Sequence, residues 1–473
     1  MSAPARVGTG VPSGARLLSG WGRTAPTSAQ VVAPASADEV SAVLAGAVKA
    51  GGAVPRGLGR SYGDAAQCAG GVVISTDRLD RVLGWDPATG TVRAGAGASL
   101  DALMRQFVPR GWFVPVTPGT RHVSLGGAVA ADIHGKNHHR DGSFGGCVES
   151  MTLVSPTGAH RLSPGDEEAG SYWSTVGGMG MTGLVTDVSL RLIAIETAYM
   201  RVDTERADTL DEVMSKMTDS DAGFRYSVAW IDCLAKGARL GRGVLTSADH
   251  AQLADLPARL QGQPLAFAPR QRLDIPFAAP SGLLNPLTVA AFNELWFRKA
   301  PRRRQGQIQS LSTFFHPLDG VGSWNRLYGG RGFLQYQLVV PPSASEVVRR
   351  ALEVLGAAGV PSFLAVLKRF GPRDPAPMSF PIEGLTLALD IPIGGRPLGP
   401  VLDDVDEMVA AAGGRVYLAK DARLRPELLP VMYPELDEWR AQCRVLDPEG
   451  VMISDLARRL GWLDTKLDMD KAR

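Results

Sequence analysis

The hydrophobic positions near the amino end predict one amphipathic helix after a loosely ordered leader. Residues 1–30 are rich in Gly, Ser and Pro and predict little regular structure. Ser36 and Glu39 then form a capping-box pair. The apolar positions that follow recur at helical spacing: Val40, Val43, Leu44, Ala47 and Val48. Gly51 and Gly52 are typical of the end of such a helix.

Strands and further helices are predicted along the rest of the chain. Residues 71–75 and 91–94 read as strands, and Ser99 is typical of the N-cap of a helix that runs to about Gln106. After residue 195 the glycine clusters become rarer. Longer segments with the period of a helix or a strand follow, at 210–217, 224–232 and 332–340.

Two predicted strands have one polar and one apolar face. In the segment 332–340, Gln335 and Gln337 share a face. The opposite face carries Leu334, Tyr336 and Leu338. The segment 385–392 is expected to turn four apolar residues to the core, namely Leu385, Leu387, Leu389 and Ile391. Its other face then carries Thr386, Ala388 and Asp390.

Composition narrows the class of protein. The chain has 473 residues, of which 45% are hydrophobic and 21% are charged, so two or three globular domains are expected. A net charge of +2 gives no indication of a polyanion partner. The cysteines are far apart and lack metal-site spacing, which favours reduced, buried thiols: Cys68, Cys147, Cys233 and Cys443.

Neither a signal peptide nor a membrane span is predicted. The amino end lacks a charged start followed by an apolar run, and no stretch of about 18 apolar residues occurs. We therefore expect a cytoplasmic or membrane-associated protein, and a location on the periplasmic side stays open.

Three glycine-rich loops, at residues 55–64, 118–139 and 176–185, are the first candidates for chemistry. They are either plain turns or ligand-binding loops. The matches Gly57-Leu-Gly59 and Gly95-Ala-Gly97 lack the third glycine and the strand–turn–helix context of a Rossmann fingerprint, which excludes that site. Backbone amides of such loops also hold a pyrophosphate, and the segments 56–63 and 124–128 suit that task.

The same three loops resemble the FAD-binding fold of the vanillyl-alcohol-oxidase superfamily. Within it, four strings resemble the family of decaprenylphosphoryl-β-D-ribose oxidases: AADIHGKNHH at 130–139, VLKRFGPR at 366–373, YLAKDAR at 417–423 and DLARRL at 455–460. The resemblance extends from about residue 15 to residue 463. Members of this family are the oxidising half of an epimerase that makes the arabinose donor for cell-wall arabinan.

The resemblance implies an α+β flavoprotein of two domains, in which a substrate domain with an antiparallel sheet divides the FAD domain in sequence. We expect the first part of the FAD domain at 1–195, with a disordered leader at 1–15. The substrate domain is expected at 196–410. Residues 411–473 would complete the FAD domain, in agreement with the change of composition near residue 195.

The family pattern also implies the site residues. It implies FAD contacts at Arg56, Gly57, Leu58, Gly59, Arg60, Ser61, Tyr62, Gly63, Asp64, Ala65, Gly119, Ser124, Leu125, Gly126, Gly127, Ala131, Asp132, Ile133, His134, Val185 and Tyr417. It implies substrate contacts at Lys136, Trp230, Gln335, Gln337, Lys368, Ala388, Asp390 and Lys420. It implies catalytic roles for Lys420, Tyr62 and His134.

Each of these roles has a structural alternative. Lys420 would stabilise the negative charge that a flavin gains with a hydride and would help to deprotonate the substrate, although a single lysine is more often a solvated charge. His134 is either close to the flavin or held by backbone groups. Tyr62 either forms a hydrogen bond near the reacting centre or only packs on the isoalloxazine. Lys368 suits a phosphate, whereas the glutamines have an equal chance of being ordinary strand residues.

The implied reaction is oxidation of the C2 hydroxyl of a polyprenyl-phosphoryl ribose to a ketone. An NAD(P)H-dependent reductase would complete the epimerisation, and oxygen or a quinone would take the electrons. An aldonolactone or alditol oxidase that acts on soluble sugars is the alternative within the superfamily, and a non-catalytic flavin-binding protein is the third hypothesis. The segment WFRKAPRRRQ at 296–305 predicts either contact with anionic lipid or a solvated loop, and nothing indicates nucleic-acid binding.

Two departures from related proteins lead to predictions. Superfamily members that attach FAD through one bond often carry a histidine where this chain has Arg60, so non-covalent FAD is expected. Mycobacterial members of the family carry a cysteine at the position of Ala388, and that thiol forms the adduct with nitroaromatic suicide inhibitors.

Overall fold

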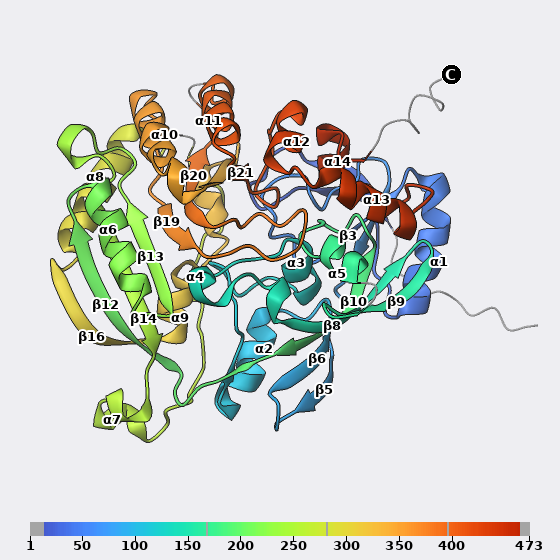
Figure 1. Ribbon diagram of the computed structural model, residues 1–473, viewed down its shortest axis with the longest axis horizontal. Helices are drawn as coiled ribbons and strands as arrows, with labels where there is room; N and C mark the ends of the chain where they lie inside the picture. Colours follow the sequence, from blue (N-terminus) through green and yellow to red (C-terminus); the bar gives the residue numbers. More distant parts are fainter. Residues whose placement is uncertain (1–13, 167–168, 281, 395–396, 464–473) are drawn as a thin grey trace, which may run out of the picture.

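Two sets of sheets lie side by side in the computed structural model, which describes residues 14–166, 169–280, 282–394 and 397–463 (Figure 1). The amino-terminal half and the carboxyl-terminal helices form one part, and a large antiparallel sheet with its helices forms the other. This architecture confirms the expected α+β fold. The expected disordered leader at 1–15 lies almost wholly outside the described residues.

The first sheet has four strands in the order β1-β2-β4-β3. Its strands are β1 (Gly14–Leu18), β2 (Thr27–Val32), β3 (Ala53–Arg56) and β4 (Val72–Ser75). The expectation of little regular structure before residue 31 is wrong, because β1 and β2 pair antiparallel in that stretch. Backbone pairing between these two strands supplies the order that the polar composition did not indicate.

The second sheet has five strands in the order β5-β6-β10-β8-β9. Its strands are β5 (Val82–Asp86), β6 (Thr91–Gly95), β8 (Val148–Ser155), β9 (Gly158–Leu162) and β10 (Leu184–Arg191). The helices of this part are α1 (Ala37–Ala47), α2 (Leu100–Phe107), α3 (Leu125–Ala130), α4 (His138–Asp141) and α5 (Ala169–Thr175).

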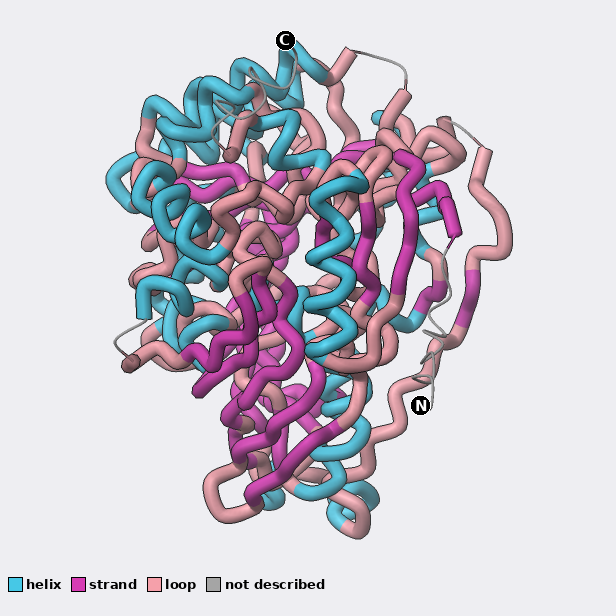
Figure 2. The backbone as a smooth tube through the Cα atoms, turned by 90° about the vertical axis from the view of Figure 1, so that its right-hand side faces the viewer, coloured by secondary structure: helices cyan, strands magenta, loops and turns pink. Residues whose placement is uncertain are grey.

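Helix α1 packs between the first two sheets (Figure 2). Its buried residues Val40 and Leu44 join one apolar cluster with Ile74 of β4 and Val154 of β8. Ser36 caps the helix as predicted and accepts the N–H of Glu39. The Glu39 carboxylate, however, accepts the N–H of Ala35 at 2.9 Å, one residue before the position of a capping box.

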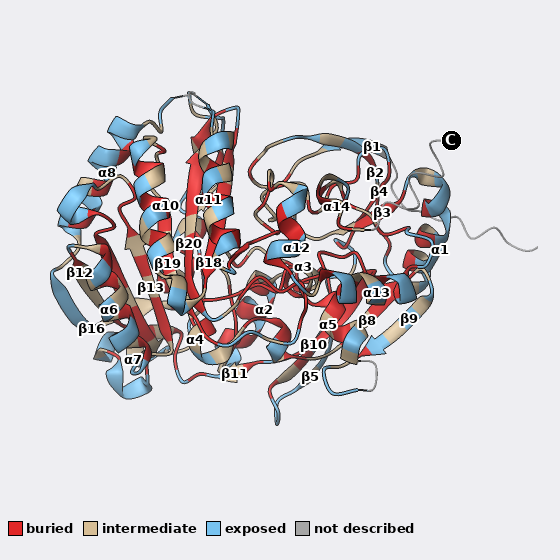
Figure 3. Ribbon diagram, turned by 45° about the horizontal axis from the view of Figure 1, so that its top comes forward, coloured by how far each residue is buried: buried red, intermediate tan, exposed pale blue. Residues whose placement is uncertain are grey.

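The third sheet has eight antiparallel strands in the order β16-β12-β14-β13-β19-β20-β18-β21. Its strands are β12 (Tyr199–Ala207), β13 (Tyr226–Ile231), β14 (Gly243–His250), β16 (Arg303–Ser310), β18 (Phe333–Val340), β19 (Ala365–Phe370), β20 (Gly384–Pro392) and β21 (Arg415–Val416). One face is covered by α6 (Leu210–Asp221), α10 (Glu346–Ala357) and α11 (Gly399–Ala411), as Figures 1 and 3 show.

Smaller elements complete the structure. Two short sheets pair β7 (Trp112–Phe113) with β11 (Ile193–Ala194) and β15 (Leu273–Asp274) with β17 (Val321–Gly322). The remaining helices are α7 (Ala258–Gln261), α8 (Pro286–Lys299), α9 (Leu311–Phe315), α12 (Leu429–Met432), α13 (Leu436–Leu446) and α14 (Asp455–Leu460). None of the helices in the described part of the chain has the length and apolar character needed to cross a membrane.

The carboxyl-terminal segment returns to the first sheet. The N–H of Ile453 donates to the Ala53 carbonyl at 2.9 Å, and Met452 forms a bridge with Ala53. This contact favours a FAD domain that is completed by residues after 411. The preceding β21 nevertheless belongs to the eight-stranded sheet, so the domain boundaries stay a prediction.

Candidate active site

The uncovered face of the eight-stranded sheet carries the polar residues of the site. Directly opposite residues share a face in an antiparallel pair, and the register pairs Gln335 with Asp390, Gln337 with Ala388, and Lys368 with Thr386. The predicted division of both strands into a polar and an apolar face is thereby confirmed. Trp230 pairs with Val366, which pairs with Ala388, so it belongs to the same face.

His134 lies against this face at the centre of a hydrogen-bonded chain. The Thr386 hydroxyl donates to the Leu338 carbonyl at 2.7 Å, so it accepts from the Gln337 amide at 2.9 Å. The second N–H of that amide points to His134 Nε2 at 3.1 Å. This arrangement leaves Nδ1 as the protonated nitrogen of His134.

Lys368 accepts the hydrogen bond that the His134 Nδ1–H group donates. Its Nζ lies 3.0 Å from His134 Nδ1, where a neutral amine accepts and an ammonium does not. Burial, together with the charges of Lys420 and Lys136, holds the pKa of Lys368 well below its usual range. Burial likewise lowers the pKa of His134, so both shifts favour the neutral forms of the pair.

Asp390 is the buried carboxylate of the site. It accepts hydrogen bonds from the Gln335 amide and, at 3.2 Å, from the Tyr328 hydroxyl. Burial raises the pKa of Asp390 to about 6, and the charge of Lys420 opposes that rise. Burial also lowers the pKa of Lys420 to about 8, against the attraction of Asp390. The two groups therefore titrate on either side of neutral pH, as suits acid–base chemistry.

Lys420 is positioned by the loop that follows β21. Tyr417 fixes this loop through its hydroxyl, which donates to the Ala131 carbonyl at 2.7 Å, and Tyr62 fixes it through its N–H, which donates to the Ala419 carbonyl at 3.0 Å. Lys420 Nζ lies 5.7 Å from the centre of the Tyr62 ring. The structure thus brings together the three predicted catalytic residues, because His134 packs on the Tyr417 ring at 5.5 Å.

One arginine joins two of the motif strings and the first glycine-rich loop. Arg459 donates to both oxygens of Asp64 at 2.9 Å and to Asp421 at 2.9 Å. Gly63 approaches the Asp421 carbonyl so closely that a Cβ there would collide with it. The loop at 56–64, the YLAKDAR string and the DLARRL string therefore form one unit around Lys420.

The loops on the other side of this unit fit FAD. A Cβ on Gly57 would collide with Ser124 Oγ, so only glycine lets these two loops meet. In the described part of the chain, the N–H groups from Leu58 to Ser61 donate to no protein acceptor, and Gly59 has a φ of +63°. Consecutive free N–H groups around a left-handed residue form an anion nest. The buried Thr76 hydroxyl next to Gly57 also lacks a partner among described residues.

Several predicted site residues use their side chains within the protein. Arg56 donates to the carbonyls of Ser19 and Ala66 at 2.8 and 3.0 Å. The Asp132 carboxylate accepts from the Gly145 N–H at 2.8 Å and from Ser379. Lys136 bonds to the Phe314 carbonyl, and Trp230 Nε1 donates to the Phe363 carbonyl at 3.0 Å. These side chains therefore have partners within the protein that hold the loops and strands of the site in place.

Sequence reasoning missed two parts of the site. Tyr328, which bonds to Asp390, comes from a short helical turn with no recognisable motif. Phe370 packs on the His134 ring at 4.7 Å, and its place in the VLKRFGPR string was the signal that could have found it. The sequence placed Thr386 on the polar face, but its hydrogen bond to Gln337 could be found only from the register between β18 and β20.

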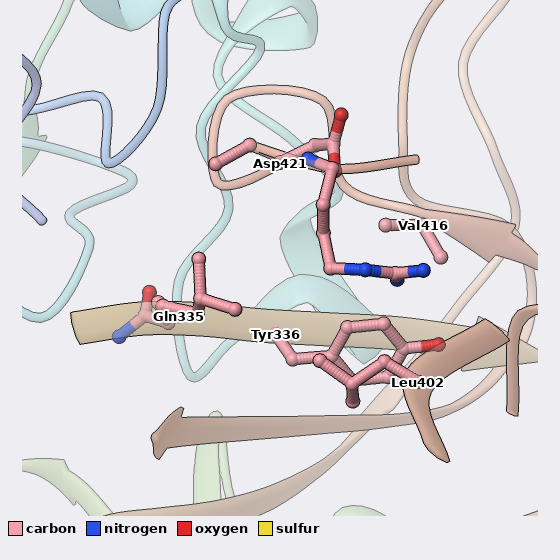
Figure 4. A pocket seen from close by; sticks show the side chains of 8 residues that line it. Gln335, Tyr336, Leu402, Val416 and Asp421 are labelled. Carbon is pink, nitrogen blue, oxygen red and sulfur yellow. The ribbon is translucent and has the colours of Figure 1, made fainter. Parts of the chain in front are cut away.

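A small cavity lies behind the sheet, next to the loop of Lys420 (Figure 4). It is lined by Leu334, Gln335, Tyr336, Leu402, Val416, Asp421, Ala422 and Arg423. Two of its polar side chains share one partner, because the Asp406 carboxylate accepts from Tyr336 at 2.7 Å and from Arg423 at 2.6 Å. The cavity lies between β18 and α11.

Comparison with known proteins agrees with this geometry. A family model described as FAD binding domain matches residues 28–163. The chain is 44% identical over 456 residues to decaprenylphosphoryl-beta-D-ribose oxidase of Mycolicibacterium smegmatis, which covers 96% of this chain and 99% of that protein. It is 26% identical to L-gulono-1,4-lactone dehydrogenase of Mycobacterium tuberculosis, over 94% and 99% of the two chains. It is 25% identical to alditol oxidase of a Streptomyces species, over 94% and 98%.

The fold, the glycine-rich loops and these similarities define an FAD-dependent oxidoreductase. The protein belongs to the decaprenylphosphoryl-β-D-ribose oxidase family.

FAD is expected to be bound without a covalent link. Arg60 stands where singly attached relatives often have a histidine, and its guanidinium lies 4.0 Å from the Trp21 ring centre and donates to the His122 carbonyl at 3.1 Å. An arginine held in this way offers no nucleophile for a flavin methyl group. Acid precipitation should therefore release yellow flavin into the supernatant. Flavin that stays with the pelleted protein would contradict this prediction.

Proposed function

We propose that the protein oxidises the C2 hydroxyl of decaprenyl-phosphoryl-β-D-ribose, or a closely similar polyprenyl-phosphoryl ribose, to the 2-keto sugar. The observation that carries this proposal is that Asp390 and Lys368 share one face of the eight-stranded sheet. Asp390 interacts electrostatically with Lys420, and Lys368 bonds to His134. The first pair suits the oxidation of an alcohol, and the second suits a phosphate. The family relationship supports the same substrate.

Asp390 is proposed to accept the proton of the C2 hydroxyl. Gln335 and Tyr328 hold the carboxylate in place, and its raised pKa brings its proton affinity closer to that of a useful base. Lys420 stabilises the negative charge that develops as the C2–H bond breaks. When bound, FAD supplies the acceptor for the hydride that leaves C2.

Lys368 is proposed to bind the phosphate of the substrate. A half-buried amine with a strongly lowered pKa becomes protonated when an anion approaches, because the opposite charge favours the ammonium form. Because an ammonium cannot accept a hydrogen bond, the His134 Nδ1–H group then donates to the substrate instead of to Lys368. The amide oxygens of Gln335 and Gln337 are buried without a donor among described residues, and they offer acceptors for sugar hydroxyls.

The rate of flavin reduction by substrate should depend on pH in a bell shape. Asp390 must be ionised to accept a proton, so the rate rises as pH increases through a pKa of about 6. Lys420 must be charged, so the rate falls as pH increases through a pKa of about 8. Anaerobic stopped-flow measurements from about pH 5 to about pH 9 would record both limbs. The Asp390→Asn variant should lose most of the rate of flavin reduction and the rise of that rate at acidic pH. If the acidic limb is unchanged in this variant, another group is responsible for it.

The decisive experiment is anaerobic bleaching of the purified flavoprotein by a polyprenyl-phosphoryl ribose. Full bleaching with this substrate and none with free polyols would support the proposal. The reverse result would support the alternative, an aldonolactone or alditol oxidase, to which the similarity is lower at 25% and 26%. Absence of bleaching by every alcohol would indicate a non-catalytic flavin-binding protein.

The reaction requires further partners. The 2-keto product needs an NAD(P)H-dependent reductase to return a hydride to the other face of C2, which yields the arabinose epimer. Oxygen or a quinone is proposed as the final electron acceptor. Because the substrate carries a polyprenyl tail, we also propose peripheral contact with a membrane.

A further inference from the structure

Helix α8 has an unusual exposed face. Its buried residues Val289, Asn293 and Phe297 recur every four positions and anchor the helix. The opposite side of a surface helix is normally polar, yet here Leu287 is 83% exposed and Leu295 is 68% exposed. Among the described residues, seven of the fourteen large apolar side chains that are exposed fall between Leu273 and Trp296. Such a concentration marks an interaction surface rather than chance exposure.

Positive charge surrounds this face. Residues 270–304 contain seven basic and two acidic side chains, a net charge of +5 in a chain whose total is +2. One of the two carboxylates, Glu294, is already paired with Arg242 and Arg298. Arg302, Arg303 and Arg304 follow the helix and are all exposed. Apolar side chains flanked by arginines fit a surface with an apolar interior and anionic head groups.

A row of aromatic rings connects α8 to the candidate active site. Trp296 stacks on Phe292 with ring centres 6.0 Å apart, and Phe292 meets Phe363 at 5.7 Å. Phe363 in turn stacks on Tyr328 at 5.7 Å, and the Tyr328 hydroxyl bonds to Asp390. The row therefore runs from the outer surface to the proposed catalytic carboxylate. Figures 1 and 3 show α8 at the end of the molecule opposite α1.

We propose that the exposed face of α8 and the arginines that follow it bind an anionic lipid bilayer, and that the aromatic row is the path along which the polyprenyl tail reaches the site. The second clause rests on the proposed function, whereas the first does not. Helix α8 would lie in the plane of the bilayer interface with Leu287 and Leu295 inserted. Arg298 and residues 302–304 would contact the head groups.

Vesicle co-sedimentation of the flavin-loaded protein tests the surface without any substrate. Wild-type protein should sediment with phosphatidylcholine vesicles that contain about 30% phosphatidylglycerol, and binding should fall in high salt because screening weakens the arginine contacts. The double variant L287E/L295E should bind at least about tenfold more weakly, because it places two charges in the apolar interface. The matched control is Val445→Glu on α13, which changes an apolar residue that is 65% exposed outside the surface and should bind like wild type.

Two results would overturn the proposal. The first is wild-type protein that does not sediment with anionic vesicles. The second is a double variant that retains its flavin and binds the vesicles as well as wild type. A wild-type dimer that the double variant converts to a monomer, without vesicle binding, would assign the face to self-association instead. Bleaching of the flavin by a short-chain, detergent-free polyprenyl-phosphoryl ribose is measured separately, so failure of the proposed function is distinguishable from failure of this surface.

Discussion

Lys420→Ala should leave FAD bound and slow its reduction by substrate about 10²- to 10³-fold, the effect of removing one group that stabilises charge in a transition state, about 2.7–4 kcal/mol. The lysine is half-buried beside Tyr62 and Tyr417, and its pKa of about 8 leaves it mostly charged at neutral pH. No other basic side chain among the described residues raises or lowers the pKa of Asp390. Removal of Lys420 therefore takes away the one cation, among the described residues, that lowers the pKa of Asp390.

The measurement is single-turnover stopped-flow reduction, with the flavin content of each variant determined from its absorbance. Lys49→Ala, which removes an exposed lysine beyond α1, is the matched control and should reduce at the wild-type rate. A Lys420→Ala variant that retains FAD and reduces at an unchanged rate would show that Lys420 is not catalytic. A variant that has lost FAD would instead give Lys420 a role in holding the cofactor.

The polar face of the sheet was predictable from the sequence because a strand has a fixed period of two. The alternation at 332–340 and 385–392 was sufficient to place Gln335, Gln337 and Asp390 on one side. The N-caps Ser36 and Ser99 were equally local signals, and both accept the predicted N–H groups. Features that depend on neighbouring residues in sequence are therefore the part of the fold that the chain reveals directly.

The contacts that depend on distant segments were not predictable in this way. The pairing of β1 with β2 left no hydrophobic pattern in the leader, because both strands are short and partly exposed. Tyr328 reaches Asp390 across 62 positions of sequence. The neutral form of Lys368 follows from the orientation of Gln337 and His134 and from the neighbouring lysines, which no sequence pattern specifies. Motif strings located the site, but its hydrogen bonds and protonation states required the structure.

Ala388 should make the protein insensitive to covalent inhibition by nitroaromatic suicide inhibitors. It lies on β20 between Gln337 and Val366, half-buried on the polar face. The family resemblance implies that this is the position of the reactive cysteine in mycobacterial members. Alanine has no nucleophile, and hydride transfer needs none at this position. Such inhibitors should therefore bind only reversibly and more weakly, while ordinary turnover continues.

Intact mass spectrometry after turnover with inhibitor provides the test. The native thiols are poor competitors, because burial raises the pKa of Cys147 and Cys233 to about 12 and the pKa of Cys443 still further. Wild-type protein should keep its mass, whereas Ala388→Cys should gain the mass of one inhibitor adduct in the presence of substrate. Ala388→Ser, which adds a polar atom of similar size without a thiol, is the matched control and should gain nothing. An adduct on wild-type protein, or none on Ala388→Cys that still turns over, would show that position 388 does not decide covalent inhibition.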